Sequence, residues 1–314
     1  MQQVDNAAEM KARAKKKMIT KVLVALIIAG VGLPLLAIVA FSSMPGRIVG
    51  FIFYFLVISF GLYEFAKILP LGKWAKYYIP LLTFVFAFYP FQDFKDWIIM
   101  DKQTLVFDEF ISSQYAFRIF GIDGLGYVIT AVYLFFPFLF VKWNKLTIWS
   151  YLLVTAATIM IGIAGKNLFY LNGGDFWFMI IIIISAALTD SFAYFGGKLL
   201  GNKIFKRKLA PKISPNKTIE GAIIGYLVGF VVAFGSLFNH QFANNFTLVW
   251  WVQQILIPLT LPIVAIIGDL MFSLVKRIMH IKDFASLIPE HGGLLDRLDS
   301  IIVVTFFYLM IFLI

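Results

Sequence analysis

The sequence of 314 residues contains no cysteine and few charged side chains. Without cysteine, disulfide bonds, a thiolate nucleophile and cysteine-ligated zinc sites are all excluded. Only 14% of the residues are charged and 61% are hydrophobic, and the mean hydropathy is +0.88. Soluble domains carry roughly one quarter charged residues and under half apolar ones, so this composition excludes an ordinary water-soluble fold.

Acidic residues are the scarcest charged class, and several enzyme motifs are missing. There are 17 acidic residues against 27 Lys and Arg, which leaves a net charge of +10. In a soluble protein this surplus would suggest nucleic acid; in so hydrophobic a chain it indicates cytoplasmic loops, and we expect no nucleic-acid partner. The absence of G-x-x-x-x-G-K-[ST], H-E-x-x-H and G-x-S-x-G patterns argues against P-loop ATPases, zincins and serine hydrolases.

Long uncharged windows dominate what is present. A helix needs about 20 mostly apolar residues to cross the hydrocarbon core. Nine windows without a charged residue meet or approach this length. They are 22–46, 48–63, 77–92, 125–141, 146–165, 176–189, 221–239, 241–268 and 300–314. We therefore predict an all-α, polytopic integral membrane protein with about nine transmembrane helices.

The distribution of basic residues predicts the orientation. Segment 1–21 is strongly basic, the loop 198–217 contains seven bases and no acid, and the segment 91–118 is rich in acidic residues. The positive-inside rule then places the N-terminus and the loop 198–217 in the cytoplasm. We divide the chain into a basic cytoplasmic segment 1–21, N-terminal transmembrane helices 22–175 and a catalytic transmembrane region 176–314. The expected location is the cell membrane, with the active site facing the cytoplasm.

Polar residues in or beside the spans mark three candidate clusters, because a charge in the membrane is costly. In the first, Asp190, Tyr194 and Lys198 share one helical face. A structural ion pair or a lysine reaching the interface explains this cluster equally well. In the second, Ser214 and Pro215 predict a helix start with Ser214 as N-cap, followed by Lys217 and Thr218. Such a helix start suits phosphate binding, although ordinary capping is the simpler interpretation.

The third cluster is the most informative. Asp269, Ser273 and Lys276-Arg277 share a face at the end of the eighth window, and Asp296 and Asp299 lie one turn apart at the entry to the ninth. Carboxylates beside lysine and arginine, with a Gly292-Gly293 turn between them, match the needs of Mg²⁺-dependent phosphoryl chemistry. A solvated charge cluster would explain poorly why acids and bases converge at the ends of two apolar spans.

This third stretch resembles the signature of the phosphatidate cytidylyltransferases, also called CDP-diacylglycerol synthases. That signature runs from Ser-x-x-Lys-Arg through Lys-Asp and His-Gly-Gly to Asp-Arg-x-Asp. The matching positions are Ser273, Lys276-Arg277, Lys282-Asp283, Pro289, His291-Gly292-Gly293, Asp296-Arg297 and Asp299. The segments around Asp190 and Lys217 are also similar to motifs of this family. The sequence departs from the usual family residues at Asn216, His280 and Glu290, and none of these changes removes an expected ligand.

The resemblance implies an enzyme that transfers CMP from CTP to phosphatidate and releases pyrophosphate. It implies Mg²⁺, with K⁺ as a second ion of this family, held by Asp269 and Asp296, with Asp299 as a further ligand. The residues expected to take part in catalysis are Asp269, Lys282, Asp283, His291, Asp296 and Arg297. Those expected to bind substrate are Asp190, Lys198, Ser214, Lys217, Thr218, Ser273, Lys276, Arg277, Gly292 and Gly293. The expected partners are CTP, phosphatidate and the lipid bilayer, and a homodimer is the oligomer considered.

Two other functions are open to such a chain. A CTP-dependent lipid or polyprenol kinase would share CTP and Mg²⁺ but would transfer the γ-phosphate. An ion-coupled secondary transporter would place ions on intramembrane aspartates, but it predicts internal repeats and polar residues in both halves, and neither is present.

Overall fold

The computed structural model describes most of the helical part of the chain. The described residues are 30, 32–41, 44–69, 74–88, 124–136, 139, 148–174, 176–201, 203–205, 207–235, 248–285 and 292–311. A short helix covers Gly32–Phe41. The other elements are α2 (Met44–Ile68), α3 (Ala75–Phe88), α7 (Gly124–Phe135), α8 (Ile148–Gly174), α9 (Phe176–Leu200), β1 (Lys208–Ala210), β2 (Ser214–Thr218), α10 (Ile219–Phe234), α11 (Leu248–Ile278) and α12 (Leu295–Ile311).

The predicted helices form where the uncharged windows lie. Each of the nine windows contains a helix within the described residues. Four helices are long and apolar enough to cross a bilayer, namely α2, α8, α9 and the part of α11 that begins at Ile255. Large apolar side chains such as Trp149 and Val231 are exposed on the outside, as in a protein surrounded by lipid. The architecture is that of a helical membrane protein, and the count of nine spans stays a prediction.

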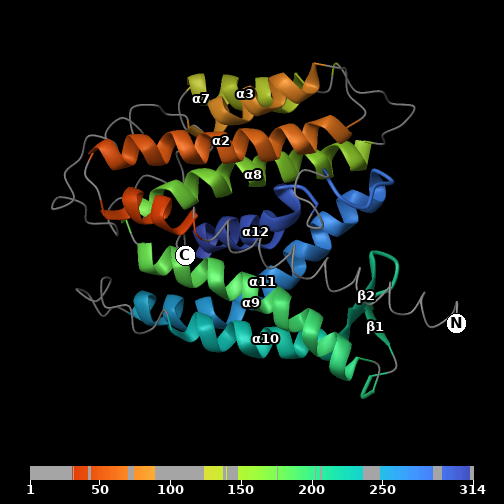
Figure 1. Ribbon diagram of the computed structural model, residues 1–314. Coiled ribbons are helices and arrows are strands. Elements are labelled where there is room, and N and C mark those ends of the chain that lie inside the picture. Colours follow the sequence, from red (N-terminus) through yellow and green to blue (C-terminus); the bar gives the residue numbers. More distant parts are fainter. Residues whose placement is uncertain are drawn as a thin grey trace, which may run out of the picture.

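The helices pack in layers around a shared apolar core (Figure 1). Helices α2 and α8 lie side by side, α3 and α7 cover the outer side of α2, and α9 and α10 lie on the opposite side of the bundle. Helix α12 lies between these layers and packs against α8, α9 and α11. Phe65, Phe178 and Phe272 are fully buried in the core that these helices share. The first turn of α12 is thereby enclosed by elements from both halves of the chain.

One element differs from the helical prediction. Residues Ser214–Thr218 form strand β2, which pairs antiparallel with β1, with Lys208 opposite Thr218 and Ala210 opposite Ser214. Helix α10 begins only at Ile219, and its N-cap is Thr218, whose side chain accepts a hydrogen bond from Gly221 N at 3.1 Å. The prediction of Ser214 as N-cap is therefore wrong. Both residues favour N-caps, but Thr218 directly precedes the apolar run, and Pro215 is compatible with a strand in this small hairpin.

The hairpin is fixed to the helix that follows it. Glu220, in the first turn of α10, is 3% exposed, and its Oε1 accepts hydrogen bonds from Ile204 N at 3.1 Å and Phe205 N at 2.8 Å. The hairpin lies at the end of the bundle where α9 and α11 end and α12 begins (Figure 1). Lys217, on β2, is thereby held next to α11, where it pairs with Asp269.

Small residues allow α9 and α10 to approach closely. Gly221, Gly225 and Gly229 repeat every four residues along α10, and a Cβ on Gly225 would collide with the carbonyl oxygen of Thr189 in α9. Backbones in contact at small-xxx-small stripes are typical of membrane helices. This contact sets the distance between the face of α9 that carries Asp190 and the hairpin that carries Lys217.

A methyl group on this stripe is expected to destabilise the protein. Replacing Gly225 by Ala should lower the free energy of unfolding by about 1–3 kcal/mol, because the colliding atom is backbone and moves only with its helix. Gly235, which ends the same helix, has open space where its Cβ would lie, so Gly235→Ala should change stability by less than about 0.5 kcal/mol. Thermal unfolding of both variants in detergent measures the difference, and equal melting temperatures would contradict the prediction.

Candidate active site

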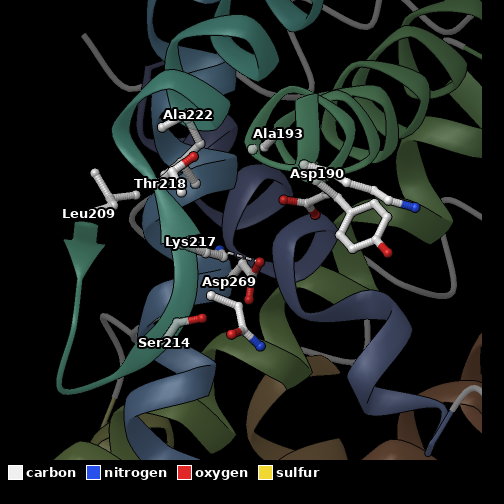
Figure 2. Close-up of a pocket in the computed structure, with 13 residues that line it drawn as sticks. Asp190, Ala193, Leu209, Ser214, Lys217, Thr218, Ala222 and Asp269 are labelled. Carbon is white, nitrogen blue, oxygen red and sulfur yellow. Dashed lines mark ion pairs between the residues drawn. The ribbon is translucent and has the colours of Figure 1, made fainter. Parts of the chain in front are cut away.

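A pocket of about 450 Å³ opens where the hairpin meets the helix ends (Figure 2). Its walls come from α9, the two strands of the hairpin, the start of α10 and α11. The lining residues are Asp190, Ala193, Tyr194, Gly197, Lys198, Leu209, Ser214, Asn216, Lys217, Thr218, Ala222, Ile266 and Asp269. The pocket therefore unites the first two predicted clusters with Asp269 of the third. The predicted face formed by Asp190, Tyr194 and Lys198 is confirmed, since all three line it.

An ion pair crosses this pocket. Lys217 on β2 pairs with Asp269 on α11, as the dashed line in Figure 2 shows. Ser273, one turn further along α11, donates a hydrogen bond to Asp269 Oδ1 at 3.3 Å, which confirms their predicted common face. On the facing helix, Asp190 Oδ2 accepts a hydrogen bond from Ser300 Oγ at 2.5 Å. The pocket thus presents two lysines and two carboxylates from three different elements.

A second cluster lies at the start of α12. The ammonium of Lys276 contacts Asp296 Oδ1 at 2.9 Å and lies 4.0 Å from Asp299 Oδ2. The other oxygen of Asp296 accepts hydrogen bonds from the backbone N–H groups of Phe284 and Gly293, each at 2.9 Å. Lys276 and Asp299 are buried. Charge-assisted hydrogen bonds of this kind fix a carboxylate firmly, so Asp296 has a single defined position.

The two clusters act on each other electrostatically. Asp190 and Asp299 each experience the negative charge of Asp269, and Asp190 is also influenced by Lys217 and Arg297. Three carboxylates in one region of low dielectric constant repel one another, and Lys217 and Lys276 offset only part of this charge. The carboxylates therefore attract cations, and the lysines attract the phosphate groups to which such cations bind.

The predicted metal ligands do not form one compact set. Within the residues that the structure describes, no three acidic or histidine side chains are placed as a ready metal site. Asp269 is paired with Lys217, while Asp296 and Asp299 share Lys276. Mg²⁺ in proteins is usually held by one or two carboxylates together with water and substrate phosphates. The oxygen donors of Asp269 and its neighbours fit that type of site, and Mg²⁺ stays a prediction.

Gly292 and Gly293, which are predicted to bind substrate, form a tight turn beside Asp296. Gly292 has φ 81°, in the left-handed region that favours glycine. The N–H of Gly293 donates to Asp296 Oδ2, and a Cβ at Gly293 would lie 2.6 Å from Glu64 Oε2. The turn therefore brings its backbone against two carboxylates. In this structure the amide of Gly293 holds a site residue in place.

The remaining predicted residues lie around these clusters. Arg277 is exposed and donates from Nε to the carbonyl of Ile213, at 3.2 Å, which links α11 to the hairpin. Lys282 and Asp283 are exposed and lie outside the 450 Å³ pocket. Arg297 is exposed on the first turn of α12. His291 lies outside the described residues, so its predicted role is untested.

A tight turn connects α11 to the segment that holds Asp296. The N–H of Ile281 donates to Lys276 O at 2.9 Å and that of His280 to Arg277 O at 3.1 Å, which together form a Schellman motif. The motif requires a left-handed residue at its centre, and His280 takes that position with φ 56°. The family resemblance expects glycine there, and the φ value explains that preference.

Replacing His280 by Gly is therefore expected to stabilise the protein by up to about 1 kcal/mol. Relief of the left-handed strain exceeds the added entropy of the unfolded chain. His280→Ala keeps a Cβ and should give no such gain. The melting temperatures of the two variants in detergent provide the measurement, and a gain for both or for neither would contradict this origin of the strain.

Two site residues were missed in the sequence. Ser300 reaches Asp190, and Glu64 of α2 contacts the start of α12. Ser300 directly follows Asp299 and is the first residue of the uncharged window 300–314, which gives no signal of a site residue. Glu64 directly follows the uncharged window 48–63, and a lone carboxylate at the end of a span was the available signal.

Carboxylates and lysines that gather among apolar helices are typical of membrane enzymes that act on phosphorylated substrates. The sequence profile of the Cytidylyltransferase family matches residues 20–314, and the chain belongs to this family. It is 32% identical to a phosphatidate cytidylyltransferase of Bacillus subtilis (strain 168) over 206 residues, 64% of this chain and 73% of that protein. It is also 33% identical to a phosphatidate cytidylyltransferase of Rickettsia bellii over 164 residues, 51% of this chain and 69% of that protein.

Proposed function

We infer that this chain is a phosphatidate cytidylyltransferase, which transfers CMP from CTP to phosphatidate and produces CDP-diacylglycerol and pyrophosphate. One observation carries the inference beyond family membership. Residues far apart in the sequence, such as Asp190 and Ser300, lie in hydrogen-bond contact at one charged site. The motifs that resemble the family thus meet in space around a pocket lined by two carboxylates and two lysines.

The reaction requires two polyanions to approach each other. A phosphate oxygen of phosphatidate attacks the α-phosphorus of CTP, and a new P–O bond forms. The bond between the α-phosphorus and the oxygen that bridges to the β-phosphorus breaks, and pyrophosphate leaves with its electron pair. The attacking phosphate is already ionised near pH 7, so no separate general base is needed. Catalysis then depends on positioning and on compensation of negative charge.

The described residues suit these two tasks. Lys217, Lys276 and the arginines of the motif supply positive charge, and Lys198 lies at the mouth of the pocket. Half-buried Lys217 is paired with Asp269, and buried Lys276 is paired with Asp296, so substrate phosphates would exchange one negative partner for another. Asp269 would hold Mg²⁺ together with water and substrate phosphates, with K⁺ as the second ion, and Asp296 and Asp299 are the other carboxylates proposed as ligands. When bound, Mg²⁺ neutralises charge on the phosphoryl oxygens and the leaving pyrophosphate.

The proposed orientation follows from the charge around the pocket. Exposed Lys203, Arg207, Lys208 and Lys212 surround the hairpin, as the positive-inside rule expects on a cytoplasmic face. With nine spans and a cytoplasmic N-terminus, the pocket faces the cytoplasm, where CTP is available. The acyl chains of phosphatidate would remain in the bilayer while the headgroup enters the pocket from the membrane edge.

Product analysis tests the proposal. Purified protein in detergent is supplied with phosphatidate, Mg²⁺ and CTP labelled at the α-phosphorus, and the expected product is labelled CDP-diacylglycerol with release of pyrophosphate. A CTP-dependent lipid kinase would instead form a lipid phosphate and CDP from a lipid alcohol. Transport without chemical change of CTP would support a transporter. Absence of labelled CDP-diacylglycerol from protein that remains folded would exclude the proposed function.

A further inference from the structure

Helix α12 carries Asp296, Asp299 and Ser300, yet within the described residues the N–H groups of Leu294 and Leu295 are accepted by a side chain of another helix. The residue before its first helical position is Leu294, which has no side-chain acceptor. Asp296, in the first turn, is engaged by Lys276, Phe284 N and Gly293 N. Backbone N–H groups at a helix start need acceptors when they are buried. The acceptors come from elsewhere in the fold.

Glu64 of α2, which is 230 positions away from Leu294 in the sequence, supplies the acceptors for the first N–H groups of α12. Its Oε1 accepts the N–H of Leu294 at 3.2 Å, and its Oε2 accepts the N–H of Leu295 at 3.0 Å. Both oxygens of one carboxylate thus bind consecutive amides, and the negative charge lies at the positive end of the helix dipole. We propose that Glu64 is a positioning residue, which fixes the first turn of α12 and through it the carboxylates Asp296 and Asp299.

The burial of Glu64 supports this role over simple capping. Glu64 is 2% exposed, and burial of a carboxylate is expensive even when it is hydrogen-bonded. A serine or asparagine at position 294 would cap α12 locally without burying a charge. A carboxylate from α2, unlike a local cap, joins the N-terminal half of the chain rigidly to the helix that carries the site residues.

The Gly-Gly turn completes the arrangement. A Cβ on Gly293 would lie 2.6 Å from Glu64 Oε2 and 3.0 Å from its Cδ, so only glycine leaves room for the carboxylate here. The N–H of this same glycine donates to Asp296. Three consecutive amides, of residues 293 to 295, are therefore divided between one site carboxylate and Glu64. A shift of Glu64 would move the amide that orients Asp296.

The role of Glu64 rests on the proposed function, and the test separates the two. Glu64→Gln keeps the shape of the side chain, and its remaining oxygen can still accept one backbone N–H. Its NH₂ group faces the other backbone N–H, so that hydrogen bond is replaced by a repulsive contact. We expect kcat for CDP-diacylglycerol formation to fall at least about tenfold, with KM for CTP changing less than about threefold. Glu64→Asp keeps the charge and should retain more activity than Glu64→Gln. Gly293→Ala should reproduce the Gln phenotype, and the double variant should lose little more than either single one.

The matched control is Tyr54→Phe on the same helix. Tyr54 is buried, accepts a hydrogen bond from Asn172 Nδ2 at 3.1 Å, and lies about 15 Å along α2 from Glu64. The change removes this hydrogen bond and the one that Tyr54 donates to Met179 Sδ, and it lowers stability without touching the site. Measured below both melting temperatures, Tyr54→Phe should keep near-normal kcat while Glu64→Gln does not. An equal loss in both variants would reduce Glu64 to a stabilising residue and overturn the proposal.

Hydrogen exchange provides a measurement that is independent of the reaction. The amides of Leu294 and Leu295 should exchange at least about tenfold faster in Glu64→Gln than in the unchanged protein, because they lose their acceptors. The same peptide in Tyr54→Phe should exchange at the normal rate. Unchanged protection in Glu64→Gln would refute the positioning role even if the enzyme proves active. If Glu64→Gln exchanges faster but the unchanged protein forms no CDP-diacylglycerol, the proposed function is refuted and the positioning role of Glu64 is not.

Discussion

Replacing Asp269 by Asn is expected to reduce CMP transfer by at least about a hundredfold while the protein remains folded. Asn keeps the size of the side chain and an oxygen that can accept from Ser273, but it removes the charge that faces Lys217. Loss of one charge-stabilising group at a phosphoryl-transfer site typically costs this much or more. Turnover of α-labelled CTP with phosphatidate, at saturating concentrations of both, measures the effect.

Stability should respond differently from activity. Asp190 and Asp299 both experience repulsion from Asp269, so the Asn variant loses a pair with Lys217 and also loses two unfavourable interactions. We expect its melting temperature to stay within a few degrees of normal. A carboxylate that is kept at a crowded position without stabilising the fold is typical of functional sites.

A double variant distinguishes chemistry from simple charge balance. If Asp269 only neutralises Lys217, then Lys217→Met combined with Asp269→Asn would restore activity, because neither charge would remain unpaired. We expect the double variant to be no more active than Asp269→Asn. Recovery to more than about a third of normal turnover would show that the carboxylate does not act on substrate or ion.

The helices could be predicted because they depend on composition alone. A long stretch without charge has only one stable state in a bilayer, so the windows that contain α8, α9 and α11 were found from the sequence. The ends were less accurate, since the polar last turns of α2 and α9 extend beyond the uncharged residues to Ile68 and Leu200. Packing against neighbouring helices, which hydropathy does not describe, supports those turns.

The hairpin could not be predicted, because it depends on tertiary contacts and not on local composition. Strands β1 and β2 have three and five residues, and they lie in a basic loop with no alternating apolar pattern. Their order comes from pairing with each other and from Glu220, which binds the backbone at Ile204 and Phe205. Such contacts are tertiary, so local propensity favoured a helix start at Ser214 instead.

In the candidate site, too, contacts within one helix could be predicted and contacts between helices could not. Spacing along one helix predicted correctly that Ser273 would share a face with Asp269, since residues four apart are neighbours. It did not predict that Lys276 would pair across helices with Asp296 rather than along its own helix with Asp269. Glu64 reaches α12 only because α2 and α12 are packed together, and no local pattern contains that information.

Lys276→Met is expected to have the largest combined effect on stability and activity. Lys276 has a side chain only 11% exposed and is the cation nearest to both Asp296 and Asp299, at 2.9 and 4.0 Å. Methionine matches its length and apolar stem but leaves two enclosed carboxylates without this partner. Removal of one member of a buried ion pair typically costs about 3–5 kcal/mol. The melting temperature in detergent should fall by several degrees, and CMP transfer should fall below detection.

The matched control for Lys276→Met lies a few residues further along the chain. Lys282 is exposed, and Lys282→Met removes the same charge and adds the same side chain. Because this change leaves no buried carboxylate without its partner, it should alter the free energy of unfolding by less than about 0.5 kcal/mol. The triple change Lys276→Met, Asp296→Asn and Asp299→Asn removes the stranded charges as well and should recover most of the lost stability, but no activity. If the triple variant stays as unstable as Lys276→Met, packing of the lysine stem rather than its charge stabilises this end of α12.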